Sequence, residues 1–517
     1  MSSEFKNEPF TDFSDPANRQ AQAEALKTVE ASFGATYPLI LAGMEVTLDS
    51  TFESINPSRK EQVVGRFQSA TGKEVDAAIH AAEDAFPAWS RKTAQQRADI
   101  LFKGAQLMRQ RRFILNAWMI LEEGKSWAEA DGDTAEAIDF LEFYGQEALR
   151  YAEEQPLTPC PGEKNRMVYI PLGVGAIIPP WNFPLAILAG MATSAMVAGN
   201  TVVLKPSSDA PGIGYQFMKL MQDAGTPSGV LNYLTGSGSR IGDALTSHPK
   251  IRFITFTGSK EVGLHINELA AKAAPGQIWI KRVICEMGGK NFIIVDKDAD
   301  LEAAAKSVVS SAFGYQGQKC SACSRAIIHQ DVYDDMVGRI RQETAKLVQG
   351  KVSQGPETFL GPVINERAHK SIMAYIEQGK KEGKLVNGGE PGDAAGFFIQ
   401  PTVFADVSPD AVIAREEIFG PVLAIIKAQD FDDAIRISNN TVYGLTGAVY
   451  TANREHIDQA ARECFVGNLY FNRKCTGALV GVHPFGGFNM SGTDSKAGGR
   501  DYVSLFLQAK SMSEAVG

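Results

Sequence analysis

Hydrophobic and polar residues recur along this chain with periods that predict a helix-rich beginning. Asp15 and Pro16 precede a stretch rich in alanine, glutamine and glutamate, which predicts a helix to about Gly34 with Asp15 as N-cap. Helical periodicity then returns before any long apolar strand, over residues 73–89, 94–123 and 130–153. A polar, proline-interrupted stretch at 151–169 follows, which we interpret as an excursion from the first domain.

Residues 167–204 contain no charged side chain, a length that raises the possibility of a membrane-spanning helix. We reject that interpretation because four prolines, at 171, 179, 180 and 184, interrupt the stretch. Residues 173–178 instead predict a buried strand, 184–198 a buried helix and 201–204 the next strand.

The alternation of strands and helices continues beyond this stretch. Helices are predicted at 211–224, 239–247 and 260–272, and strands at 230–234 and 251–257. A second series starts at the apolar strand 291–295, with a strand at 326–329 and helices at 301–313, 332–347 and 366–382. This pattern predicts an α/β fold of two doubly wound parallel-sheet domains with a boundary near Glu286. Residues 502–508 predict an alternating strand that has no partner nearby in sequence.

Composition excludes several classes of protein. The net charge of −9 arises from 51 basic and 60 acidic residues that are well mixed, which gives no indication of nucleic-acid binding. Charged residues throughout positions 1–30 leave no room for the apolar core of a signal peptide. The six cysteines show no framework spacing, which fits a reducing compartment. We therefore expect a cytoplasmic protein that does not bind a membrane.

Two cysteines have contrasting surroundings. Cys320 follows two glutamines, a glycine and a lysine, polar neighbours that suit a partly exposed thiolate, although a lone cysteine is usually a small buried residue. Cys285 ends an apolar run and is expected to pack in a core. Glu286 follows it and precedes two glycines, where a carboxylate suits a general base; a surface ion pair is the plainer alternative.

Four stretches together resemble the motifs of the aldehyde dehydrogenase superfamily, in the order of that family and over nearly the whole chain. They are residues 181–184 (WNFP), 285–290 (CEMGGK), 315–325 (YQGQKCSACSR) and 417–421 (EIFGP). Within the family, residues 320–322 and 477–487 resemble the branch that oxidises L-glutamate γ-semialdehyde, the 1-pyrroline-5-carboxylate dehydrogenases.

The resemblance implies a division of the chain into three parts. Residues 1–153 and 170–286 would form an NAD(P)-binding domain, and 287–494 a catalytic domain. Residues 154–169 and 495–517 would form a small β element that extends a neighbouring subunit. It therefore implies a homo-oligomer, at least a dimer.

A GxGxxG fingerprint for a dinucleotide is absent. Residues 236–242 have the wrong glycine spacing and alone predict a turn into a helix. Ser259 is better placed, since it can cap a helix whose amides would face a pyrophosphate. By resemblance, Lys205 binds the adenosine ribose and Glu417 the nicotinamide ribose. The other expected cofactor residues are Ile178, Pro180, Trp181, Ser208, Gly238, Gly258 and Phe419.

The expected cofactor is NAD. Ser208 stands where many family members carry a glutamate that would repel the extra phosphate of NADP, so tolerance of NADP stays open. No metal is expected, because the CxxC at 320–323 lacks a second pair of ligands.

The resemblance also assigns the chemistry. Cys320 would attack the aldehyde, Asn182 and the Cys320 amide would hold the oxyanion, and Glu286 would activate water to hydrolyse the thioester. Considered by itself, Asn182 would be interpreted as a turn residue between two prolines. Lys319 is the local candidate for favouring the thiolate and an anionic substrate, with a salt bridge to Glu136 equally plausible.

The substrate tail would be held by a separate set of residues. Ser321, Gly477 and Ala478 would bind the α-carboxylate, and Phe183 and Phe485 would flank the stem. Gly477 as a turn glycine and Phe485 as core packing are the alternatives.

The leading hypothesis is NAD(P)-dependent oxidation of L-glutamate γ-semialdehyde to L-glutamate, the second oxidative step of proline breakdown. The chain has no room for a proline dehydrogenase domain, so coupling to that enzyme would join separate proteins. The alternatives are an aldehyde dehydrogenase for another short carboxylated aldehyde, a CxxC thiol-disulfide redox protein and a catalytically silent scaffold.

Overall fold

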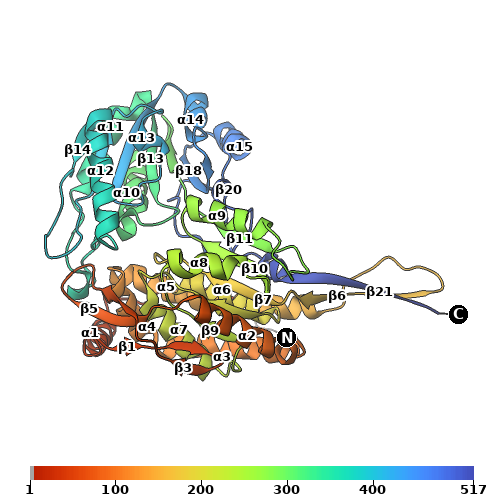
Figure 1. Cartoon of the computed structure of the whole chain (residues 1–517). Coiled ribbons are helices and arrows are strands. Elements are labelled where there is room, and N and C mark those ends of the chain that lie inside the picture. Colours follow the sequence, from red (N-terminus) through yellow and green to blue (C-terminus); the bar gives the residue numbers. More distant parts are fainter. Residues whose placement is uncertain (1–4, 517) are drawn as a thin grey trace.

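The computed structural model describes residues 5–516 of the chain. It contains two large sheets, each packed against helices, and a two-stranded ribbon that projects away from them with the C-terminal end at its tip (Figure 1). The α/β class predicted from the alternation of strands and helices is confirmed.

The N-terminal part begins with helix α1 (Pro16–Glu30), where the Asp15 side chain accepts a hydrogen bond from the Ala17 amide (2.9 Å). The predicted cap is therefore confirmed. A small sheet that was not predicted follows, in the order β1-β5-β4. Its strands are β1 (Thr36–Tyr37), β4 (Thr51–Ile55) and β5 (Val63–Gln68).

Four helices come next: α2 (Gly72–Ser90), α3 (Ala94–Gln110), α4 (Arg112–Glu122) and α5 (Trp127–Ala152). The prediction of one helix over 94–123 was wrong, because the chain leaves the helical region at Arg111 (φ −103°, ψ 12°). Helix α5 packs closely on α3 and α6, and one of its faces is exposed to the cavity described below.

The first seven-stranded sheet has the order β11-β10-β7-β8-β9-β2-β3. Neighbours from β11 to β9 are parallel, as predicted, whereas β2 and β3 form an antiparallel edge that was too short to predict. The strands are β2 (Leu39–Leu41), β3 (Met44–Val46), β7 (Val174–Ile178), β8 (Thr201–Leu204), β9 (Leu231–Tyr233), β10 (Ile251–Thr257) and β11 (Arg282–Glu286).

The helices between these strands explain the uncharged stretch. Helix α6 (Ala186–Val197) is almost entirely buried within the protein, between the sheet and α5. The others are α7 (Pro211–Asp223), α8 (Gly238–Ser247) and α9 (Lys260–Ala271). Among the described residues, no helix is both long and apolar enough to cross a membrane.

The second seven-stranded sheet has the order β14-β15-β16-β13-β12-β18-β19. Its core strands β16, β13, β12 and β18 are parallel. The strands are β12 (Asn291–Val295), β13 (Cys323–His329), β14 (Lys384–Asn387), β15 (Thr402–Ala405), β16 (Val422–Ala428), β18 (Thr446–Tyr450) and β19 (Asn468–Phe471), with a separate pair β17 (Tyr443–Gly444) and β20 (Phe488–Asn489).

Several helices accompany this sheet. They are α10 (Leu301–Phe313), α11 (Tyr333–Thr344), α12 (Glu366–Glu382), α13 (Val412–Arg415), α14 (Phe431–Ser438) and α15 (Arg454–Glu463), with 3-10 turns η1 (Gly314–Gly317), η2 (Gln330–Val332) and η3 (Val352–Gln354). Figure 1 shows this half of the protein above the half built on the first sheet.

The ribbon pairs β6 (Glu163–Pro171) antiparallel with β21 (Leu507–Ala515) along nine residues. The predicted strand at 502–508 was wrong over most of its length, because residues Tyr502–Phe506 form the 3-10 turn η4. Tyr502, Val503 and Phe506 are buried, and the Phe506 ring lies 5.4 Å from Phe253 of the first sheet. Packing against the body thus outweighs the alternating pattern.

Candidate active site

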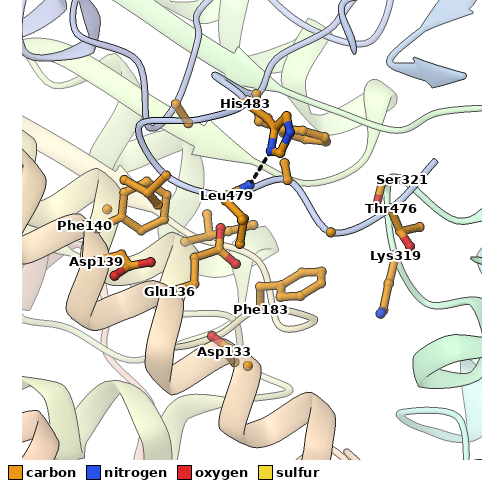
Figure 2. Close-up of a pocket in the computed structure, with 18 of the residues that line it drawn as sticks. Asp133, Glu136, Asp139, Phe140, Phe183, Lys319, Ser321, Thr476, Leu479 and His483 are labelled. Carbon is orange, nitrogen blue, oxygen red and sulfur yellow. Dashed lines mark hydrogen bonds between the residues drawn. The ribbon is translucent and has the colours of Figure 1, made fainter. Parts of the chain in front are cut away.

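A cavity of about 580 Å³ lies between helix α5, the loop at 319–321 and the loop at 473–485. In Figure 2, Asp133, Glu136 and Asp139 project from one helix, with Lys319, Ser321 and the loop containing Thr476 and Leu479 around them. Many of the residues expected at a catalytic or substrate site line this cavity. They are Glu136, Phe183, Glu286, Lys319, Cys320, Ser321, Gly477, Ala478 and Phe485.

The loop that carries Cys320 has a constrained backbone. Tyr315 and Gln316, just before it, adopt positive φ angles of 49° and 56°. The Gln316 side-chain amide donates to the carbonyl groups of Gly124 (3.1 Å) and Pro362 (2.7 Å). These bonds offset the strain of left-handed backbone at two residues that are not glycine.

Cys320 is partly exposed at the cavity wall, and its carbonyl accepts a hydrogen bond from the Asn291 side chain (2.7 Å). Burial, followed by the charges of Glu417 and Glu286, raises the pKa of the Cys320 thiol to about 12. Burial at the cavity wall therefore opposes the thiolate that the polar neighbours in sequence were expected to favour.

Lys319 forms an ion pair with Glu129 of α5, with 2.6 Å between its Nζ and the carboxylate. The salt bridge to Glu136, which the sequence left open as an alternative, is not formed, because the partner of Lys319 is Glu129. Burial, followed by the charge of Asp133, raises the pKa of Glu136 to about 8. Glu136 therefore faces the cavity as a carboxyl group whose charged form is disfavoured by burial.

Glu286 is the last residue of β11, where the parallel strand opens into Gly288 and Gly289. Its Oε1 accepts a hydrogen bond from the Ser495 hydroxyl (2.6 Å), and within the described chain its buried Oε2 has no partner. Burial raises the pKa of Glu286 to about 8, against the opposing effect of the Ser495 hydroxyl. A buried carboxyl group whose pKa lies near the working pH can exchange protons with water in the cavity.

Asn182 is buried beside the Cys320 loop and is not one of the residues lining the cavity. Its Nδ2 donates to the Gln318 carbonyl at 3.0 Å, two residues before Cys320. One of the two amide hydrogens is thus used to hold the loop. The second amide hydrogen of Asn182 has no hydrogen-bond partner among the described residues.

The Phe183 ring lies against a buried charge that the sequence patterns did not indicate. The Lys125 ammonium is 4.3 Å from the centre of the Phe183 ring and 4.6 Å from that of Tyr315. It also forms a fully buried ion pair with Asp133 (2.7 Å). Lys125 therefore links α5 to a wall of the cavity and to the loop that precedes Cys320.

The loop containing Gly477 and Ala478 is braced by its own side chains. Arg473 donates to the Thr476 and Gly477 carbonyls (3.0 and 3.1 Å), and His483 accepts from the Leu479 amide (3.2 Å). Gly477 has φ +76°, a conformation that favours glycine. Phe485 pairs through its backbone with Ala497 and is one of the residues that line the cavity.

Several of the expected cofactor residues lie at the carboxyl ends of parallel strands in the first sheet. Ile178 ends β7, with Pro180 and Trp181 just after it, while Lys205 follows β8 and Gly258 follows β10. In open α/β sheets this edge is where ligands bind.

The residues at this edge are suited to a dinucleotide. Ser259 caps α9 by accepting from the Val262 amide, as predicted, and Gly238 begins α8. Within residues 5–516 the buried Lys205 ammonium has one hydrogen-bond partner, the Pro206 carbonyl, and burial lowers its pKa to about 8. The Ser208 hydroxyl donates to the Gly236 carbonyl (3.1 Å). The Lys205 ammonium therefore has hydrogen-bond donors left for a ligand, and the first backbone amides of a helix are also available. Such groups fit ribose and phosphate.

Glu417 and Phe419 reach the same region from the second sheet. Glu417 accepts a hydrogen bond from the Gly289 amide (2.9 Å), and burial raises the pKa of its carboxyl group to about 7. The Phe419 ring lies edge-on to Trp181, with 5.5 Å between the ring centres. The expected cofactor residues of the two halves thus meet between the sheets.

The two cysteines of the CxxC differ in environment. Cys320 faces the cavity, whereas Cys323 begins β13 and is buried in the core of the second sheet, as Cys285 is buried in that of the first. The Cys320 and Cys323 thiols therefore do not face a common site, as the two thiols of a redox pair would.

The chain belongs to the aldehyde dehydrogenase family, whose model matches residues 45–512. It is 56% identical over 510 residues to 1-pyrroline-5-carboxylate dehydrogenase of Geobacillus thermodenitrificans (strain NG80-2), with 99% of each chain covered. The structure is similar to that of 1-pyrroline-5-carboxylate dehydrogenase from Thermus with bound NAD, with a TM-score of 0.98, 48% identity and full coverage of both chains. It is also similar to proline utilization A from Bdellovibrio bacteriovorus (TM-score 0.97, 43% identity), covering 99% of this chain and 53% of that one.

Proposed function

We propose that this chain catalyses the NAD-dependent oxidation of L-glutamate γ-semialdehyde, the open form of 1-pyrroline-5-carboxylate, to L-glutamate. The observation that supports this most is that one cavity contains a cysteine, a buried carboxyl group of pKa about 8 and the glycine loop at 477. The 56% identity to a 1-pyrroline-5-carboxylate dehydrogenase points to the same substrate.

In the proposed reaction Cys320 attacks the aldehyde carbon and forms a hemithioacetal. The thiol proton leaves to solvent as the C–S bond forms, which leaves Glu286 available as the base for the later hydrolysis. The developing oxyanion would accept hydrogen bonds from the free Asn182 amide hydrogen and the Cys320 backbone amide.

The hemithioacetal carbon then loses a hydride, which NAD accepts when bound, and a thioester to Cys320 remains. Glu286 would remove a proton from water as that water attacks the thioester. Collapse of the adduct releases the carboxylate and returns the thiol. Two electrons leave the substrate as hydride, and one oxygen atom enters from water.

The substrate tail would extend along the cavity away from Cys320. The Ser321 hydroxyl and the Gly477 and Ala478 amides would bind the α-carboxylate, while Phe183 and Phe485 flank the stem. Lys319 is compensated by Glu129, so it would contribute less charge to this site than the sequence suggested. Glu136 would face the α-amino group.

The cofactor would lie at the strand ends of residues 1–153 and 170–286, facing a catalytic domain of residues 287–494. Lys205 would hold the adenosine ribose and Glu417 the nicotinamide ribose. Ser208 adds no negative charge at the adenosine end, so use of NADP alongside NAD remains part of the proposal.

Several features of the cellular setting are also proposals. The ribbon of residues 154–169 and 495–517 would join a second copy in a homo-oligomer. A separate proline dehydrogenase would supply the substrate in the cytoplasm.

The test is NADH production from 1-pyrroline-5-carboxylate compared with a panel of aldehydes of similar length. We expect the highest kcat/KM for 1-pyrroline-5-carboxylate, and a better substrate among the other carboxylated aldehydes would overturn the assignment. Cys320→Ser should abolish activity, whereas Cys323→Ser, which changes a buried core residue, should retain most of it. Equal loss in both variants would favour dithiol chemistry.

A further inference from the structure

The first segment of the described chain, residues 5–13, lies at the cavity and contributes to its wall through Glu8, Phe10 and Thr11. It is fastened to α4 and α5. Thr11 donates through its amide and its hydroxyl to Asp131 (both 2.7 Å), and Glu8 forms an ion pair with Arg112 (3.3 Å). The segment precedes α1 and belongs to none of the sheets.

Asn7 connects this segment to two different walls of the cavity. Its Nδ2 donates to Asp139 Oδ2 on α5 (2.8 Å) and to the carbonyl oxygen of Val480 (3.0 Å). Asp139 is held in place by a further hydrogen bond from the Glu8 amide (2.7 Å). Both hydrogens of one amide group therefore bridge a helix and a loop that are more than 300 residues apart in sequence.

A second contact reaches the same part of the loop. The Phe5 ring lies so close to Gly481 that a Cβ added there would be 3.2 Å from it, and Phe5 also packs edge-on against Phe143 of α5 with 5.2 Å between ring centres. The segment thus contacts two consecutive residues of the loop, one by a hydrogen bond and one by packing.

The loop receives different support at its two ends. Arg473 holds the Thr476 and Gly477 carbonyls from the near side, and Asn7 holds Val480 from the far side. Between these two supports the chain runs from Gly477, which has a positive φ, through Ala478, and neither residue belongs to a helix or strand. Backbone of this kind moves readily unless its ends are fixed.

We infer that Asn7 is a positioning residue for the substrate, because it holds the 477–480 loop against α5 in the geometry that binds the α-carboxylate. This inference rests on the proposed function, since it assumes that the loop receives a carboxylate. Asn7 does not itself contact the reacting atoms. Its contribution should appear in substrate binding and leave the chemical step at Cys320 unchanged.

The test compares Asn7→Ala with Asn18→Ala. Asn18 is a matched control, since its side chain also donates to a backbone carbonyl, that of Asp12 (2.9 Å), and it is exposed outside the cavity. We expect Asn7→Ala to raise KM for 1-pyrroline-5-carboxylate by about threefold to tenfold, the effect of losing one or two hydrogen bonds. The kcat of Asn7→Ala and both constants of Asn18→Ala should be unchanged.

A second substrate separates positioning from a general structural effect. For an aldehyde of similar length without the α-carboxylate, Asn7→Ala should leave KM within about twofold, because its binding does not depend on the loop amides. An equal rise for both aldehydes, or no rise for either, would overturn the inference. Failure of the unmodified enzyme to oxidise 1-pyrroline-5-carboxylate would instead overturn the proposed function.

A binding measurement covers the case in which Asn7→Ala folds poorly. In the Cys320→Ser background, Asn7→Asp keeps the size of the side chain and replaces the amide that donates to the Val480 carbonyl with a carboxylate that has no hydrogen to donate. Calorimetric titration should show that L-glutamate binds more weakly to this double variant than to Cys320→Ser alone. NAD should bind equally well to both. Equal affinity for L-glutamate would show that the segment does not position the loop.

Discussion

At the scale of single residues, the site is defined by partly buried carboxyl groups that line the same cavity as a thiol. The pKa values of Glu136 and Glu286 are both raised to about 8, in each case mainly because burial removes water from the charged form. They differ in their partners: Glu286 accepts a hydrogen bond from Ser495, while the charge of Asp133 acts on Glu136. At pH 7 only a fraction of each carboxyl group is therefore ionised and able to accept a proton.

The proposed base predicts a pH dependence. Water can be activated only by the ionised carboxylate, so kcat should rise with pH through about 8, where half of Glu286 is ionised. Ser495→Ala removes the hydrogen bond that lowers this pKa, so the rise should move to higher pH. Steady-state rates between pH 6 and 10 measure both effects.

Glu286→Gln provides the control for this prediction. It should turn over slowly with no rise near pH 8, and should still give a burst of NADH because hydride transfer precedes hydrolysis. An unchanged rise in Glu286→Gln would contradict the assignment of the base.

Sequence reasoning reached residues that lie within local motifs and missed those that act through distant contacts. Cys320 and Glu286 lie in short stretches with recognisable neighbours. Lys125, Asn7 and Arg473 carry no such signal, because their partners are brought close only by the fold. Lys319 shows the same limit, since proximity in sequence to Cys320 could not reveal that Glu129 neutralises its charge.

At the scale of elements, long apolar strands and periodic helices were predictable because burial dictates their residue types. The parallel strands β7, β8 and β10 lie where the apolar runs indicated. A strand of two residues, such as β1, is defined by its partner and carries no pattern of its own. The prediction of a strand at 502–508 was wrong for a related reason, since the apolar residues of this stretch pack on the body as a 3-10 turn.

The link between α4 and α5 predicts a large effect from one side chain. Lys125→Met keeps most of the volume but leaves Asp133 buried without its cation, and breaking a buried pair in this way costs about 3–5 kcal/mol. Urea unfolding should show a loss of that size. Asp133→Asn combined with Lys125→Met should recover part of it, because no charge is then left unpaired. A loss in the double variant equal to the sum of the single losses would contradict a direct interaction.

At the scale of the whole molecule, the ribbon of β6 and β21 is the element that does not pack on the rest of the protein along most of its length. Within residues 5–516, strands β6 and β21 pair only with each other, and most of their residues are partly or fully exposed. A two-stranded ribbon is marginally stable in water, and both of its outer edges are free to bond another strand. The homo-oligomer proposed above would provide a surface of a second copy of the chain on which this ribbon packs.

Removal of residues 508–517 tests this explanation at the scale of the assembly. The truncation leaves Tyr502, Val503 and Phe506 in the body, so the thermal unfolding temperature of that body should change little. Light scattering coupled to size exclusion should give the mass of two or more chains for the full protein and a smaller mass after truncation. A full-length monomer would contradict the proposed oligomer. An unchanged oligomer after truncation would place the contact between copies on another surface, because β6 would then have lost its pairing partner without consequence.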